Sequence, residues 1–348
     1  MFQHILVLLD GSRRAELALP VAVRLARANS ASLTLLRLVA LPADYVWYKL
    51  EPPYLAQDIL TTEMRNASTY LKSKAWDMDM AGISAHIHVM PHLPLEQIHV
   101  FIEEQAIDLV VLCSRGQISS RPRWQQSMAL QILRQSSVPV LVLRETSGCS
   151  GTLYPRDARP VRVLVPLDGS VMAEAALPVA ATLSTTLSAP LSGMLHLMRV
   201  LPLMEKPDAT ETLKRLKQHA RDDAQAYLQA TSRALQKQAT GQQPFSITTC
   251  VLFHPEVAEA IVDTAEAKQP GAETMGTNDQ CDLIALASRG RGGKNSSSIG
   301  STAERILQRT NLPFLVVPPL PAEDVGNKAD ASFFQQGEAA KDGRCPAT

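Results

Sequence analysis

Short apolar runs alternate along the chain with longer segments of helical period. The runs are rich in Val, Ile and Leu without strict alternation, which is typical of strands buried on both faces of a sheet. They cover 4–9, 33–39, 85–90, 109–113 and 139–143, and later 162–167, 191–200, 246–252, 283–287 and 313–317. The alternation predicts an α/β fold with parallel strands, right-handed crossovers and helices on both faces.

The chain is one unit written twice. ILVLLDGS at 5–12 matches VLVPLDGS at 163–170, and LVVLCSRG at 109–116 matches LIALASRG at 283–290. The repeat predicts two similar, open, mostly parallel five-stranded sheets. We refer to the two units as copy one and copy two.

The repeat also predicts the domain organisation. Copy one is expected at residues 1–146 and copy two at 161–320, joined by a linker at 147–160 where Ser, Gly and Pro gather. Residues 321–348 carry many small and charged side chains without a period, so a disordered tail is predicted there.

Composition and charge limit the classes of partner and the cellular compartment that we expect for this protein. The 348 residues include 34 Lys+Arg and 34 Asp+Glu, which gives a formal net charge of zero and argues against nucleic acid or an anionic membrane as partner. The five cysteines are scattered and form no CxxC pair, as expected in a reducing cytoplasm. The longest uncharged stretch, 175–198, is predicted to be a helix followed by a strand. We therefore expect a cytoplasmic protein.

The first strand of each copy ends in Asp-Gly-Ser. Ligands of open α/β sheets bind at the carboxyl ends of the strands, where the strand order reverses. Asp10 and Asp168 are therefore candidates to accept a hydrogen bond from a ribose hydroxyl. The alternative is that each aspartate only stabilises the turn and the following helix, which Ser12 or Ser170 can cap.

A glycine-rich loop follows the fourth predicted strand of copy two and leads into a predicted helix at 301–309, with Ser301 and Glu304 at capping-box spacing. Such a loop presents backbone N–H groups to an anion, and the helix dipole favours negative charge. Positive charge and hydroxyl donors come from Arg289, Arg291, Lys294, Ser301 and Thr302. The pattern predicts phosphate binding; the alternative is a solvated basic loop with an ordinary helix cap. Neither a P-loop nor a dinucleotide fingerprint matches.

The chain resembles the universal stress proteins in their tandem form, over about residues 1–145 and 160–319. Nucleotide-binding members of that family carry an Asp at the end of strand one and the pattern Gly-x2-Gly-x9-Gly-[Ser/Thr] after strand four. Copy two has Ala287-x2-Gly290-x9-Gly300-Ser301, which keeps the spacing and replaces the first glycine by alanine. Copy one has Cys113-x2-Gly116-x9-Gln126-Ser127 and loses two of the three glycines.

The resemblance implies an adenine-nucleotide α-hydrolase-like fold whose copies form a pseudo-dimer through their last strands. It also implies ATP bound by its phosphates on the glycine loop, with any Mg²⁺ held mainly by those phosphates. The adenosine would lie near Asp168 and Val200. The counterpart of Val200 in copy one is placed at Val39. The implied binding residues are Pro166, Leu167, Asp168, Gly169, Val200, Ala287, Ser288, Arg289, Gly290, Arg291, Gly300, Ser301 and Thr302. The association of two chains into a homodimer is also left open.

Copy one is expected to bind nucleotide weakly or not at all, because Gln126 stands where a glycine would let phosphate approach the backbone. Its histidines, His86, His88, His92 and His99, are either a metal site or solvated imidazoles, and their spacing matches no established zinc pattern.

The sequence shows no spacing typical of a catalytic nucleophile with an adjacent base. The resulting prediction is a stress-response protein that binds an adenine nucleotide in copy two and acts by binding. The alternatives are a nucleotide-independent scaffold and, at most, a slow ATPase.

Overall fold

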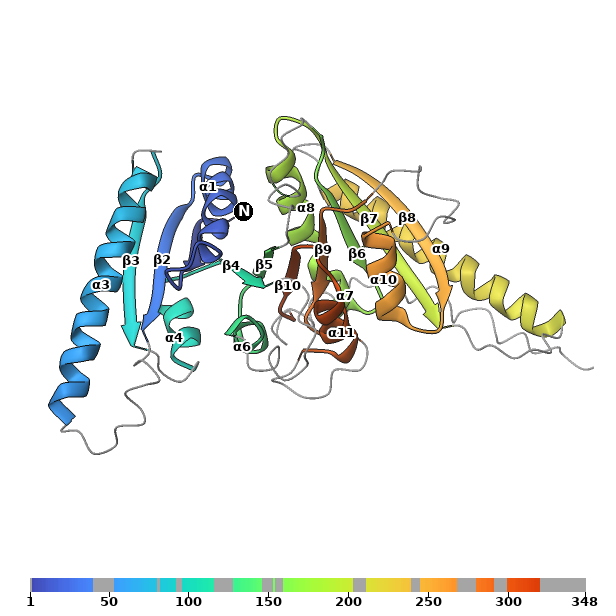
Figure 1. The fold of residues 1–348 in the computed structure, drawn as a ribbon. Helices are drawn as coiled ribbons and strands as arrows, with labels where there is room; N and C mark the ends of the chain where they lie inside the picture. Colours follow the sequence, from blue (N-terminus) through green and yellow to red (C-terminus); the bar gives the residue numbers. More distant parts are fainter. Residues whose placement is uncertain are drawn as a thin grey trace, which may run out of the picture. The chain divides into compact units, whose positions relative to one another are not determined.

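The computed structural model describes residues 2–39, 53–79, 82–91, 96–115, 128–145, 153, 159–202, 211–238, 245–267, 280–290 and 299–319. Strands and helices alternate through both copies (Figure 1). Copy one contains β1 (His4–Leu8), η1 (Ala15–Leu17), α1 (Ala18–Asn29), β2 (Ser32–Val39), α3 (Pro53–Asp79), β3 (Ala85–Pro91), α4 (Glu96–Glu104), β4 (Leu109–Arg115), α6 (Met128–Gln135) and β5 (Val140–Glu145). Copy two contains β6 (Arg162–Pro166), α7 (Val171–Glu174), α8 (Ala176–Ser188), β7 (Gly193–Pro202), α9 (Glu211–Gln238), β8 (Phe245–His254), α10 (Val257–Ala265), β9 (Leu283–Ala287), α11 (Ser301–Arg309) and β10 (Phe314–Val317).

The strands form one ten-stranded sheet in the order β3-β2-β1-β4-β5-β10-β9-β6-β7-β8. All neighbours within a copy are parallel. The two halves join where β10 pairs antiparallel with β5, with Leu315 opposite Leu141, and Figure 1 shows these two strands side by side. The predicted α/β fold and the pairing of the last strands are both confirmed.

Apolar residues on both faces of the strands explain why the sheet forms. The core divides into two clusters, one on each face of the sheet. One cluster includes residues of the helices α1, α3, α8 and α9, and the other includes residues of α4, α6, α10 and α11. Side chains such as Ile5 and Leu164 are fully buried between these layers, which is why the strands read as continuous apolar runs.

The strand order fixes where a ligand crevice can form. In copy one the chain goes from β1 outward to β2 and then returns to place β4 on the other side of β1, and copy two repeats this with β6, β7 and β9. The order therefore reverses between β1 and β4 and between β6 and β9. The loops after these strands flank the expected binding crevices.

One described stretch, Val171–Ser188, has the length and hydropathy of a membrane span, and 56% of it is buried inside the protein. It comprises α7 and α8, which pack on the sheet as a core helix does, and β7 follows as predicted. Most of the predicted linker at 147–160 and the whole predicted tail at 321–348 lie outside the described residues. Their boundaries stay predictions.

Candidate functional site

The Asp-Gly-Ser turn of copy two lies at the end of β6. The backbone N–H of Leu167 donates to the carbonyl of Met198 at 2.8 Å, which ties the strand end to β7. Gly169 has a φ of +81°, a conformation that glycine adopts without a Cβ penalty. The Asp168 Oδ1 atom accepts hydrogen bonds from the Ser170 backbone N–H at 2.9 Å and from its hydroxyl at 2.6 Å. One carboxylate oxygen thus stabilises the turn, as the structural alternative predicted.

The second oxygen of Asp168 faces the end of β9. A Cβ built on Gly290 would fall on the Asp168 Oδ2 atom, so the Gly290 backbone lies against the carboxylate. The Ser288 N–H donates to the Val317 carbonyl at 2.7 Å, and the Gly300 N–H donates to the Ser288 carbonyl at 2.8 Å. These contacts bring together the end of β6, the end of β9 and the start of α11.

The start of α11 differs from the sequence expectation. Gly300 is the N-cap, with extended angles of φ −61° and ψ 148°, and no side-chain hydrogen bond caps the helix. The predicted capping box of Ser301 and Glu304 is wrong, because Ser301 is already the first helical residue. The Glu304 Oε1 atom instead lies 3.5 Å from Arg134 Nη2 of α6. Gly300 has no side chain, so the first N–H groups of α11 receive no hydrogen bond from the side chain of the N-cap residue.

The remaining predicted residues fall around this junction or outside the described chain. Pro166 and Ala287 end β6 and β9, and the Ser301 and Thr302 side chains are exposed. Arg289 is partly buried next to Gly290, whereas Arg291 and Lys294 lie outside the described residues.

Val200 lies on β7 two residues beyond Met198, which pairs with the last residue of β6. Its register therefore brings it level with Asp168. In copy one Leu36 pairs with Leu8 as Met198 pairs with Pro166, so the counterpart of Val200 is Leu38. The sequence-based placement at Val39 is off by one residue.

In copy one the same turn includes an ion pair between Asp10 and Arg14. The Asp10 Oδ1 atom accepts from the Ser12 N–H at 2.8 Å and from its hydroxyl at 2.5 Å, and Gly11 has a φ of +86°. The Asp10 Oδ2 atom lies 3.2 Å from Arg14 Nη2. Partial burial alone would raise the pKa of Asp10, but the Ser12 hydrogen bonds and the Arg14 charge outweigh it and lower the pKa. Gly116, Gln126 and Ser127 lie outside the described residues.

A second repeated arrangement was not predicted. In copy two the Tyr227 hydroxyl donates to Glu174 Oε1 at 2.7 Å, and the Arg199 guanidinium lies 5.1 Å from the Tyr227 ring centroid. Burial, followed by this hydrogen bond, raises the pKa of Tyr227. The arrangement holds the arginine of β7 over the Tyr227 ring. Matching Glu, Tyr and Arg residues in both copies were the signal that could have revealed it.

Copy one repeats these contacts. The Tyr70 hydroxyl donates to Glu16 Oε1 at 2.9 Å, and the Arg37 guanidinium lies 5.3 Å from the Tyr70 ring centroid. Its guanidinium atoms also lie 3.2 Å from the position of a Cβ built on Gly11. Arg37 therefore lies beside the Asp-Gly-Ser turn that follows β1.

Of the histidines singled out in copy one, His86 and His88 lie on β3 and His99 lies on α4. The rings of His4 and His86 meet edge to face at 6.4 Å, and His88 meets Phe101 of α4 at 5.0 Å. Burial, with some repulsion from His86 and His4, lowers the pKa of His88. Within the described ranges no group of three or more His, Cys, Asp or Glu side chains could hold a metal ion, and His92 lies outside them.

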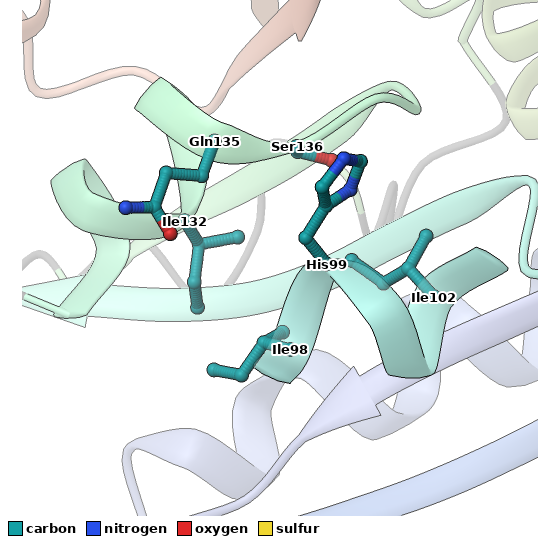
Figure 2. A pocket seen from close by; sticks show the side chains of 6 residues that line it. All are labelled: Ile98, His99, Ile102, Ile132, Gln135 and Ser136. Carbon is teal, nitrogen blue, oxygen red and sulfur yellow. The ribbon is translucent and has the colours of Figure 1, made fainter. Parts of the chain in front are cut away.

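A small groove lies between α4 and α6 (Figure 2). His99 reaches across it but is engaged locally, 3.5 Å from Glu103 Oε1 and 3.5 Å from the Ser137 hydroxyl. The groove is lined by Ile98, His99, Ile102, Ile132, Gln135 and Ser136.

The repeated sheet agrees with comparisons to known proteins. The model of the universal stress protein family matches residues 1–144 and again residues 161–318. The chain belongs to the universal stress protein family. Its two family matches correspond to the two halves of the ten-stranded sheet.

Solved structures share the fold of this universal stress protein. A universal stress protein from Archaeoglobus fulgidus DSM 4304 matches with a TM-score of 0.58 and 19% identity, over 91% of this chain and 96% of that one. A functionally unknown protein from Pseudomonas aeruginosa PAO1 gives a TM-score of 0.56 and 16% identity, over 91% and 93%. A universal stress protein in complex with cAMP covers 42% of this chain and 98% of its own, with 22% identity and a TM-score of 0.27. No curated protein matches this chain by sequence.

Proposed function

We propose that copy two binds one adenine nucleotide, with ATP as the favoured ligand, and that the protein acts as a cytoplasmic stress-response regulator. The observation that carries the proposal is the junction at the switch point of copy two. There the Asp168 carboxylate lies against Gly290, and Gly300 is hydrogen-bonded to Ser288 at the start of α11.

The phosphate end of the ligand is assigned to α11. A helix N-terminus without a side-chain cap presents N–H groups and a positive dipole end to an anion. Ser301 and Thr302 add exposed hydroxyl groups in the first turn, and Arg289 adds positive charge nearby. Gly290 lets the backbone approach closely, because any side chain there would meet Asp168.

The nucleoside end is assigned to Asp168 and Val200. The Asp168 carboxylate, held in the turn by two hydrogen bonds from Ser170, is the group that would accept from a ribose hydroxyl. Backbone groups of Leu167, Gly169 and Val200 would border the sugar and base. Because Asp168 is one carboxylate, Mg²⁺ would be held mainly by the phosphates.

We propose binding in preference to hydrolysis. Asp168 is fixed by Ser170 in a turn, which suits positioning of a ligand more than proton transfer. A nucleotide-independent scaffold of the same fold is the alternative, and a slow ATPase is less favoured.

Titration of ATP, ADP and AMP into the full chain by isothermal calorimetry tests the proposal. We expect one site of roughly micromolar affinity, near −8 kcal/mol. Asp168→Ala should weaken ATP about tenfold, which corresponds to about 1.4 kcal/mol or one hydrogen bond. Gly300→Leu should abolish binding while the circular dichroism spectrum is unchanged. No binding by the wild type, or equal binding by Gly300→Leu, would favour the scaffold.

A further inference from the structure

Helix α11, to which the phosphate end of the nucleotide is assigned, is contacted near both ends by arginines of copy one. Near its last turn, Arg144 of β5 donates a hydrogen bond from Nη2 to the Leu307 carbonyl. At its first turn, the Nη2 atom of Arg134 in α6 lies 3.5 Å from Oε1 of Glu304. Copy one therefore contributes a positive charge to the first turn of the helix that would bind phosphate in copy two.

The carboxylate of Glu304 is unfavourable for a phosphate at this helix end. A negative side chain in the first turn is attracted to the same positive dipole end as a phosphate, so the two groups compete for it. Glu304 lies four positions after the N-cap Gly300, or about 6 Å along the helix axis, which is less than the Debye length of about 8 Å at physiological ionic strength. Without a partner, Glu304 would weaken phosphate binding.

The ion pair with Arg134 offsets this negative charge. The side chains of Arg134 and Glu304 are 37% and 26% exposed, so solvent screens the pair only in part. An arginine stays protonated, and the offset is therefore permanent. Gln308 Nε2, one turn further along α11, lies 3.5 Å from Glu304 Oε1 as well, whereas Arg305 pairs with Glu256 instead.

The same pair cannot form at the matching position of the other copy. The LVVLCSRG and LIALASRG segments are 174 residues apart, and the same offset relates α6 to α11. At this offset Glu304 corresponds to Leu130, and Arg134 corresponds to Gln308. Neither counterpart carries a charge, so the two cannot form an ion pair. The pair thus accompanies copy two, which keeps the spacing of the glycine motif, and has no equivalent for copy one.

We propose that Arg134 of copy one sets the affinity of copy two for the phosphate groups of its nucleotide by neutralising Glu304. Arg134 acts through Glu304 and is therefore a positioning residue. The inference rests on the proposed nucleotide site of copy two, and it makes the affinity of that site depend on both copies. ATP, which carries the most negative charge, should depend on the pair most, ADP and AMP less, and adenosine not at all.

The first test removes the arginine from the full chain. Arg134→Gln is titrated with ATP, ADP, AMP and adenosine at low ionic strength. Arg309→Gln is the matched control, since Arg309 also forms a pair of 3.5 Å, with Glu259, but at the last turn of α11. We expect Arg134→Gln to weaken ATP about three- to tenfold, the range for a charge at a helix end, and ADP and AMP progressively less.

In the same titrations adenosine should bind to Arg134→Gln as it does to the wild type, and Arg309→Gln should match the wild type for all four ligands. Added salt should reduce the loss of ATP affinity. ATP binding by Arg134→Gln equal to that of Arg309→Gln would overturn the proposal. An equal loss for ATP and adenosine would overturn it too, because it would show damage to the site and not a charge effect.

The second test removes the carboxylate. Glu304→Gln should bind ATP at least as tightly as the wild type, because Arg134 then has no negative partner on α11. Arg134→Gln combined with Glu304→Gln should restore ATP binding to about the wild-type affinity, since no charge is left to neutralise. A double variant that binds ATP as weakly as Arg134→Gln alone would show that Arg134 does not act through Glu304, and the proposal would be rejected.

The two proposals fail in different ways. If the wild type, Arg309→Gln and Glu304→Gln bind no ATP, the proposed function is wrong and the role of Arg134 falls with it. If these three chains bind ATP and Arg134→Gln binds it as tightly as the wild type, the nucleotide site stands and only the role of Arg134 is rejected.

Discussion

Arg144 of β5 donates a hydrogen bond from Nη2 to the backbone carbonyl of Leu307 in α11, so a buried guanidinium of copy one caps the last turn of a helix of copy two. Its Nη1 atom also donates to the Ser114 hydroxyl at 3.2 Å, and the group lies 4.8 Å from the Phe314 ring centroid. Burial lowers the pKa of Arg144 to about 10, which leaves it charged at neutral pH. A cation at a helix C-terminus is favourable.

Arg144→Leu should lower the free energy of unfolding by about 2–4 kcal/mol, because a buried charge-assisted network loses its donor. Equilibrium urea unfolding measures this loss. Arg134→Leu is the matched control, since Arg134 also joins the two copies but forms a partly exposed pair with Glu304 at 3.5 Å. That variant should cost less than about 1 kcal/mol. Equal losses in the two variants would show that burial of Arg144 contributes nothing.

Two glycines of the copy two site should respond differently to alanine. A Cβ on Gly290 would fall on Asp168 Oδ2, and two hydrogen bonds from Ser170 oppose any shift of that short side chain. A Cβ on Gly300 would lie 3.5 Å from the Ser288 carbonyl, an ordinary contact, and its φ of −61° suits alanine. Gly290→Ala should therefore cost about 1–3 kcal/mol of stability, the range typical of overpacking.

Gly300→Ala should stay within about 0.5 kcal/mol of the wild type, as surface substitutions without strain do. Thermal unfolding of both variants measures the difference. If Gly290→Ala is as stable as Gly300→Ala, the close approach of Gly290 to Asp168 is not present in solution.

The alternation of apolar runs and helical segments was enough to predict the fold. Strands such as β1 and β6 are buried on both faces, and this leaves a clear signal in the sequence. The apolar sequences of the last strands, β5 and β10, likewise predicted that these strands pair. The turns at Asp10 and Asp168 were legible because Gly and Ser follow each aspartate directly.

Contacts between segments that lie far apart in the sequence could not be predicted from it. The approach of Gly290 to Asp168 depends on strand order, and the bond from Arg144 to Leu307 depends on how the two copies meet. The error at Val39 arose because the repeat offset is 158 residues at the first strand but 162 at the second. At the start of α11 the capping-box spacing pointed to Ser301 as the N-cap, whereas the N-cap is Gly300. Spacing alone cannot resolve a shift of one residue.

The paired tyrosines offer a comparison within one chain. Tyr227→Phe removes the hydrogen bond to Glu174 and should cost about 1.5 kcal/mol, as hydrogen bonds to charged groups do. Tyr70→Phe should cost less, roughly 0.5–1 kcal/mol, because Glu16 keeps an ion pair with Lys74 at 3.1 Å. Urea unfolding of the two variants and the double variant measures both losses. A larger loss in Tyr70→Phe than in Tyr227→Phe would contradict this ranking.

The Asp10 carboxyl should titrate below its ordinary range, and Arg14 should be one cause. Partial burial opposes this shift, but the Ser12 hydrogen bonds and Arg14 outweigh it, so the folded pKa is lower than the unfolded pKa. The carboxylate therefore stabilises the fold above the unfolded pKa, and this contribution is lost as the pH falls through the folded pKa. Because Asp10 is 54% exposed, we expect the contribution to stay below about 1 kcal/mol.

Arg14→Met should raise the pKa of Asp10 toward its ordinary value, while Arg14→Lys should keep part of the lowering because it retains the charge. The chemical shift of the Asp10 carboxyl carbon, followed by NMR against pH, measures the change. Arg13→Met is the control, since the exposed Arg13 is the neighbouring arginine but forms no described bond to Asp10. An Asp10 titration that is the same in Arg14→Met and in the wild type would mean that the two side chains are not paired in solution.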